Sequence, residues 1–213
     1  MKHPSCEIIG VEANPALIPQ VKPEWQNNIK LINAACSDTN DKEIDFYIEE
    51  RQSGISTASI DFIKNSRFTK GSKYLPLFSA TWNTPIKIKT ITLDSLINQH
   101  GCPDFIKIDV EGHEYNTAKG LTSKANMIAF EWHEEDFESF LKIIDHFVSL
   151  GYAEFGVVGY FEEDVPEELT FSTEGDPYME FPNKFVSAKT LTGTLSKIIN
   201  PLRRVYYGMA YAK

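Results

Sequence analysis

The stretch DFIKIDVEGHE at residues 104–114 most constrains the fold of this chain. It is a short apolar run that ends abruptly in titratable residues. The run FIKI (105–108) is typical of a strand inside a sheet, and polar groups follow it from Asp109 onward. Gly112 permits a sharp change of direction directly after the strand. The stretch therefore predicts a strand, a tight turn and a helix that begins near Glu114.

Strand and helix patterns alternate along the rest of the chain, which predicts an α/β domain. The segment EIDFYIEE alternates apolar and polar residues with a period of two, so we expect an antiparallel strand at an edge of the sheet. A chain of 213 residues is long enough for one domain and too short for two ordinary ones, so we predict a single domain over residues 1–213. Further strands are predicted in CEIIGVE, KLINAACSD, IKIKTIT, NMIAFEWHE, AEFGVVGYF and VYYGMAYA. Helices are predicted in LDSLINQHG, EYNTAKGLTSKA, DFESFLKIIDHFVSLGY and TLTGTLSKIIN.

Residues 51–85 follow neither the strand pattern nor the helix pattern. They are rich in Ser, Thr, Gly and Lys, with scattered aromatic residues. A loop of this length inside a compact domain usually serves a function. We therefore interpret the segment as an irregular insertion that covers the substrate as a flap.

Charge and cysteine content exclude several classes of protein. With 21 Lys and Arg against 30 Asp and Glu, the net charge is −9, so the chain repels phosphate backbones and anionic membranes. We expect neither nucleic acid nor a membrane as a partner. The three widely spaced cysteines, Cys6, Cys36 and Cys102, indicate no disulfide framework and no zinc ribbon. Since the start of the sequence carries no signal-peptide pattern, we expect a cytoplasmic protein.

Polar residues at strand ends are the candidates for a functional site, because ligands of open α/β sheets bind outside the carboxyl ends of the strands. Four such ends occur, and we expect them to share one rim of the sheet. They are Glu12 with Asn14, Ala35 to Asp38, Asp109 to His113, and Glu131 to Asp136. A carboxylate placed like Glu12 binds the hydroxyls of a ribose or caps a turn in solvent, and its position alone favours neither reading.

The two later ends carry groups suited to proton transfer. In an extended chain the period of two puts Asp109, Glu111 and His113 on one side, and Glu131 and His133 are likewise two apart. Carboxylates near like charges and buried imidazoles have shifted pKa values, as the base that deprotonates a hydroxyl requires. The same groups suit a divalent cation. Since carboxylate-rich strand ends are common without metals, the metal question stays open, and we favour His133 as a base or substrate contact.

Several of these motifs together resemble the FkbM family of methyltransferases in their order and spacing. They are VEANP, LINAACSD, GISTAS, ITLDSLI, DFIKIDVEGHEYNTAKGL and YYGMAYAK, of which IKIDVEGHE followed by KGL is the most specific. The resemblance implies a Rossmann-like class I methyltransferase sheet with an antiparallel C-terminal strand. It also implies S-adenosylmethionine as the cofactor and methyl transfer to a hydroxyl of a sugar, glycan or natural product.

The resemblance also implies roles for the strand-end residues. Glu12 would bind the cofactor ribose, Ala35 and Ser37 would border the adenine, and Asp109 would lie near the methionine end. The acceptor, a small molecule or a glycan, would face the remaining polar groups. The implied cofactor-binding set is Glu12, Asn14, Ala35, Ser37 and Asp109. The implied catalytic set is Asp109, Glu111, His113, Glu131 and His133.

The chain departs from the family pattern at its start. Family members begin with a strand, a glycine-rich turn and a helix, whereas Met1 lies just before the apparent second strand. We therefore expect an N-terminally incomplete sheet, which either re-pairs its strands or leaves a gap between the VEANP and IKIDV strands. The alternative function is a non-catalytic remnant that acts as a binding module for a glycan or a protein. A nicotinamide-dependent oxidoreductase ranks last, because the chain also lacks GxGxxG.

Overall fold

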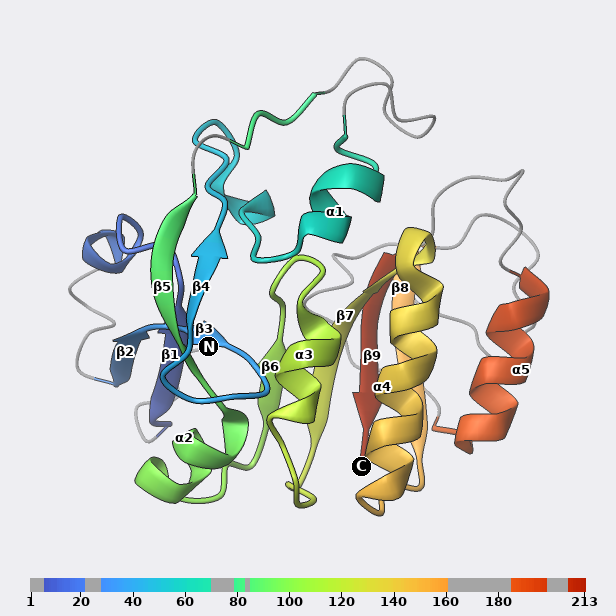
Figure 1. Cartoon of the computed structure of the whole chain (residues 1–213). Helices are drawn as coiled ribbons and strands as arrows, with labels where there is room; N and C mark the ends of the chain where they lie inside the picture. The colour runs from blue at the N-terminus through green and yellow to red at the C-terminus, as the bar shows by residue number, and fades with distance from the viewer. Residues whose placement is uncertain (1–5, 22–27, 70–78, 83–84, 161–184, 199–206) are drawn as a thin grey trace.

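The computed structural model describes residues 6–21, 28–69, 79–82, 85–160, 185–198 and 207–213 (Figure 1). Strands and helices alternate along it, which confirms the α/β class. The strands are β1 (Ile8–Glu12), β2 (Ile29–Asn33), β3 (Ala35–Cys36), β4 (Glu43–Phe46), β5 (Ile86–Ile91), β6 (Ile106–Ile108), β7 (Ile128–His133), β8 (Phe155–Tyr160) and β9 (Tyr207–Ala212). The helices are α1 (Ile60–Asn65), α2 (Leu93–His100), α3 (Glu114–Lys119), α4 (Phe137–Ser149) and α5 (Ala188–Ile198). Single 3-10 turns lie at Ile18–Gln20, Ser53–Ile55 and Glu134–Asp136.

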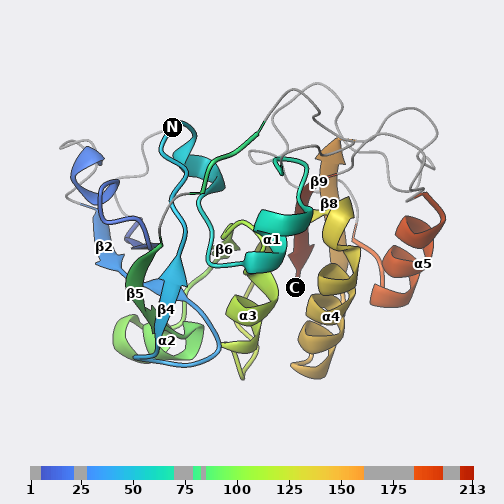
Figure 2. The same ribbon diagram turned by 45° about the horizontal axis from the view of Figure 1, so that its top comes forward.

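The largest sheet has the strand order β6-β7-β9-β8. Strands β6 and β7 are parallel, and β9 runs antiparallel to both of its neighbours. The last strand is therefore antiparallel, as expected from the sequence. Helices α3 and α4 pack side by side on one face of this sheet, and α5 contacts α4 and β8 (Figures 1 and 2).

The main core lies between this sheet and α4. The buried residues Phe140, Ile143, Ile144 and Phe147 recur at helical spacing, so α4 turns one apolar stripe toward the sheet. The ring of Phe130, from β7, lies 5.8 Å from that of Phe140 and 5.6 Å from that of Phe147, measured between centroids. These contacts fix β7 against the helix, and β7 carries two of the predicted site residues at its carboxyl end.

Two smaller groups of strands lie beside the large sheet. Strands β1 and β2 pair in parallel, and β3, β5 and β4 form a second group in which β4 is an antiparallel edge strand, as predicted. The predicted single strand in LINAACSD divides at Ala34, since β2 pairs with β1 whereas β3 pairs with β5. Among the described residues, β1 pairs with β2 alone and β6 with β7 alone. Among the described strands, no pairing joins β1 to β6, so the expected re-pairing of these two strands does not occur there.

The described part of the segment 51–85 contains a short helix, which its composition did not indicate. Ser59 begins α1, because its hydroxyl accepts the backbone N–H of Phe62 at 3.1 Å. Helix α1 lies above the carboxyl ends of β6 and β7 (Figures 1 and 2). Residues 70–78 and 83–84 of this predicted flap lie outside the described residues. No helix in the described ranges is long and apolar enough to cross a membrane.

Candidate active site at the ends of strands β6 and β7

The turn after β6 has an unusual backbone. Glu111 and Gly112 both have positive φ angles, 51° and 86°, a region that residues with a side chain rarely adopt. The buried carboxylate of Glu114 accepts the N–H groups of Val110 and Gly112 at 3.0 and 2.9 Å. The hydroxyl of Thr57 donates to the carbonyl of Glu111 at 2.6 Å. These bonds hold the turn in place and fix where the Glu111 side chain points.

His113 leaves the turn in a different direction from Glu111. Its Nε2 lies 3.2 Å from the hydroxyl of Ser37, and its Nδ1 lies 3.3 Å from Nδ2 of Asn116. Burial lowers the pKa of His113, so the ring is neutral at pH 7. The sequence predicted one common side for Asp109, Glu111 and His113, but that prediction required an extended chain. Two left-handed residues in succession break the period and turn His113 toward β3.

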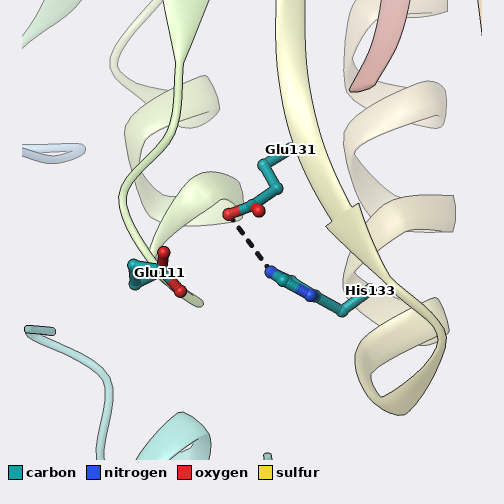
Figure 3. A group of neighbouring side chains, drawn as sticks. All are labelled: Glu111, Glu131 and His133. Atoms are coloured by element: carbon teal, nitrogen blue, oxygen red, sulfur yellow. Dashed lines mark ion pairs between the residues drawn. The ribbon is translucent and has the colours of Figure 1, made fainter. Parts of the chain in front are cut away.

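Glu111, Glu131 and His133 converge on one point (Figure 3). One side-chain oxygen or nitrogen from each lies within 4.8 Å of the others. Glu131 and His133 come from the same face of β7, and their Oε2 and Nε2 atoms are 3.1 Å apart. The side chains of Glu131 and His133 are 2% and 10% exposed, so their charges interact with little screening by water.

Arg67 joins this group from the segment after α1. Its Nη2 lies 3.1 Å from Nδ1 of His133. Because a guanidinium only donates, Nδ1 accepts, and the ring proton lies on Nε2 facing Glu131. Burial disfavours the charged ring, but Glu131 favours it, and the pKa of His133 is raised overall. Arg67 also binds Glu135 through two bonds of 2.8 Å, so it links the α1 segment to the end of β7.

Four carboxylates crowd the same region. Burial raises the pKa of Glu111 well above its usual value, and the charges of Glu131, Glu114 and Asp109 raise it further. Burial and Glu131 raise the pKa of Glu114 to about 7. Burial and Glu131 also raise the pKa of Asp109, although Lys107 lies 3.0 Å away and opposes the shift. The crowding of these carboxylates therefore favours the protonated forms of Asp109, Glu111 and Glu114.

A cavity of about 80 Å³ opens beside the cluster. Glu131 and His133 line it from β7, and Phe62 and Asn65 line it from α1. The ring centroids of Phe62 and His133 are 6.0 Å apart. The cavity can hold several water molecules or a small polar group. Part of the segment predicted as a substrate flap therefore forms a wall of this cavity.

The predicted cofactor-binding residues lie apart from the cavity. Oε1 of Glu12 accepts the backbone N–H of Asn14 at 2.6 Å, and burial raises the pKa of Glu12. Ala13 packs in one apolar cluster with Ala35, which brings the end of β1 close to β3. Ser37 is buried beside His113. None of the five predicted cofactor-binding residues, Asp109 included, is among the residues that line the cavity.

The structure thus divides the predicted residues into two groups. The β3-side group contains Ala35, Ser37 and His113, with Glu12 and Asn14 at the neighbouring end of β1. The acidic cluster contains Asp109, Glu111, Glu131 and His133. Sequence reasoning missed Arg67, Glu114 and Glu135. Glu135 lies in a strand end that the sequence indicated, but nothing in the local pattern distinguishes Arg67 from an exposed arginine.

A family model for the methyltransferase FkbM domain matches residues 2–153. The matched range is more than half of the chain and includes both groups of site residues. This chain belongs to the FkbM methyltransferase domain family. The resemblance carried by IKIDVEGHE and KGL is therefore confirmed as membership of the family. No curated protein and no solved structure matches this FkbM-family chain significantly.

Proposed function

We propose that the chain transfers a methyl group from S-adenosylmethionine to a hydroxyl of a sugar, glycan or natural product. The observation that carries this proposal is the family match over residues 2–153. The strand arrangement supports it. The parallel pair of β1 and β2 and the order β6-β7-β9-β8 with an antiparallel β9 agree with parts of a Rossmann-like class I sheet.

The β3-side group suits the nucleoside part of the cofactor. Glu12 is a half-buried carboxylate at the carboxyl end of β1, a position from which a carboxylate accepts hydrogen bonds from ribose hydroxyls. Ala35 and Ser37 offer small, buried surfaces that could border a planar base. Asp109 would lie toward the amino-acid end. When bound, S-adenosylmethionine supplies a methyl group on a positively charged sulfur.

The acidic cluster suits the acceptor. Methyl transfer is an in-line displacement, so the protein mainly has to align the hydroxyl with the methyl carbon and take the hydroxyl proton. Asp109, Glu111, Glu131 and His133 are the proposed groups for this task. The Phe62 wall would exclude water from the acceptor side.

Calorimetric titration of the full chain with S-adenosylmethionine tests the proposal. We expect one saturable site, and Glu12→Gln should weaken binding at least tenfold because a neutral amide is a poorer acceptor for two hydroxyls. Glu7→Gln, at an exposed position just before β1, is the matched control and should bind as the unchanged protein does.

Two results would count against the proposal. Absence of any saturable heat would overturn the methyltransferase proposal in favour of the non-catalytic binding module. Equal binding by the Glu12 and Glu7 variants would remove Glu12 from the cofactor site.

A further inference from the structure

We propose that Glu111, Glu131 and His133 form a binding site for a first-row divalent cation such as Mn²⁺ or Zn²⁺. Their three candidate ligand atoms lie within 4.8 Å of one another and come from two different elements, the turn after β6 and the end of β7 (Figure 3). The site does not depend on methyl transfer, because cation binding is measurable without cofactor or acceptor.

The spacing needs little adjustment to hold an ion. Metal–oxygen and metal–nitrogen bonds of about 2.0–2.2 Å place even opposite ligands no more than about 4.4 Å apart. Glu131 and His133 already satisfy this limit at 3.1 Å. The candidate ligand atom of Glu111 lies within 4.8 Å of the other two, so it has to approach them by no more than about 0.4 Å to come within this limit.

One buried carboxylate oxygen of the proposed site has no hydrogen-bond partner within the described part of the chain. Oε2 of Glu111 is buried and has no hydrogen-bond partner among the described residues. Within those ranges Glu111 also forms no ion pair, whereas a buried carboxylate oxygen without a partner costs free energy. The positive φ angle of Glu111 and the bond from Thr57 to its carbonyl fix the backbone from which this side chain projects. A cation would supply the partner that the oxygen lacks.

The two positively charged side chains near the proposed site each pair with a carboxylate outside it. Lys107 pairs with Asp109 at 3.0 Å, and Arg67 pairs with Glu135 at 2.8 Å. Glu114 adds a further carboxylate beside the group. The region around the three proposed ligands is therefore rich in carboxylates, whose charged forms a bound cation would favour.

The chemistry of the three ligand atoms determines which class of ion the site prefers. One imidazole with two carboxylates suits Mn²⁺ or Zn²⁺ better than Ca²⁺ or Mg²⁺, which prefer oxygen alone. Binding through Nε2 of His133 moves the ring proton to Nδ1, so Arg67 loses its 3.1 Å bond to that atom. Arg67 keeps its two bonds to Glu135, and the remaining coordination positions stay open to water.

Calorimetric titration of the chelator-treated full chain with MnCl₂, ZnCl₂ and MgCl₂ tests the site. We expect one saturable site for Mn²⁺ or Zn²⁺ and at least tenfold weaker binding of Mg²⁺. Glu111→Gln and His133→Gln should each weaken binding at least tenfold. Glu138→Gln, which removes an exposed carboxylate from α4, is the matched control and should bind as the unchanged protein does.

Thermal unfolding separates loss of the site from loss of the fold. In chelator, Glu111→Gln should melt no lower than the unchanged protein, because it removes one of four crowded carboxylates. With the cation at a hundred times its dissociation constant, the melting temperature of the unchanged protein should rise by about 6 °C and that of Glu111→Gln should rise hardly at all. The proposal is overturned if the unchanged chain shows no saturable binding, or if Glu111→Gln keeps the affinity and the thermal gain.

Discussion

Removing one partner of the buried ion pair between Arg67 and Glu135 should strongly destabilise the protein. Their side chains are only 8% and 7% exposed. Glu135→Gln keeps the shape of the side chain but leaves the guanidinium charge buried, which costs about 3–5 kcal/mol in comparable pairs. For a chain of 213 residues the entropy of unfolding is about 0.45 kcal/mol/K. The melting temperature should therefore fall by about 7–11 °C.

Differential scanning calorimetry at pH 7 measures this change, and the chain supplies its own control. Lys142 and Glu138 on α4 are also 2.8 Å apart, but their side chains are 48% and 80% exposed. Solvent screens such a pair, so Glu138→Gln should leave the melting temperature nearly unchanged. Replacing Arg67 and Glu135 together by Leu should restore much of the lost stability, because no unpaired charge remains. If Glu135→Gln melts no lower than Glu138→Gln, burial does not decide the strength of this pair.

Three further predictions concern other parts of the structure. Burial raises the pKa of Cys36 to about 12. At pH 8 a thiol reagent should therefore modify the exposed Cys6 and Cys102 quickly and Cys36 only after unfolding. Equal rates of modification at all three cysteines would contradict this. Gly112→Ala should lower the free energy of unfolding in urea by more than about 1 kcal/mol, because φ is 86° and an added Cβ would lie 2.7 Å from Phe62. An unchanged midpoint of urea unfolding would refute the close approach. Burial raises the pKa of Glu49, but bonds from Arg51 and Thr81 outweigh burial and leave the pKa below its usual value. Glu49 therefore stabilises the fold above about pH 4.3 and loses this effect as pH falls, so the stability gap between the unchanged protein and Glu49→Gln should narrow in acid.

The strand-end positions of the site could be predicted because apolar runs report burial and end where the chain reaches the edge of a sheet. Asp109 and Glu131 were identified in this way, and both raise the pKa of Glu111. The direction of His113 could not be predicted, because it depends on two left-handed backbone angles that the sequence signals only through Gly112. The burial of Arg67 depends on a contact with Glu135 across 68 positions, which no local pattern encodes.

Helix α1 was missed for a related reason. A segment rich in Ser, Thr, Gly and Lys resembles a loop in composition, and a helix of six residues is too short to show a clear period. Its stabilisation comes from tertiary contacts, since Phe62 packs against the rings of Phe68 and Trp82 and against Gly112. The sequence signal that does correspond to the helix is Ser59, whose hydroxyl accepts the N–H of Phe62.

The side chains of α3 determine how the two groups of site residues are spaced. Strand pairing does not join β3 to β6 among the described residues, so their alignment depends on side-chain bonds. Thr117 donates to the carbonyl of Cys36 at 3.0 Å, and Lys119 donates to Asp38 at 2.6 Å. At the end of α3, a Cβ on Gly120 would lie 2.3 Å from the carbonyl oxygen of Ser37, so the two chains touch with no room for a side chain. Helix α3 therefore sets the spacing between the two groups of site residues, and one added methyl group on Gly120 would change that spacing without altering a member of either group.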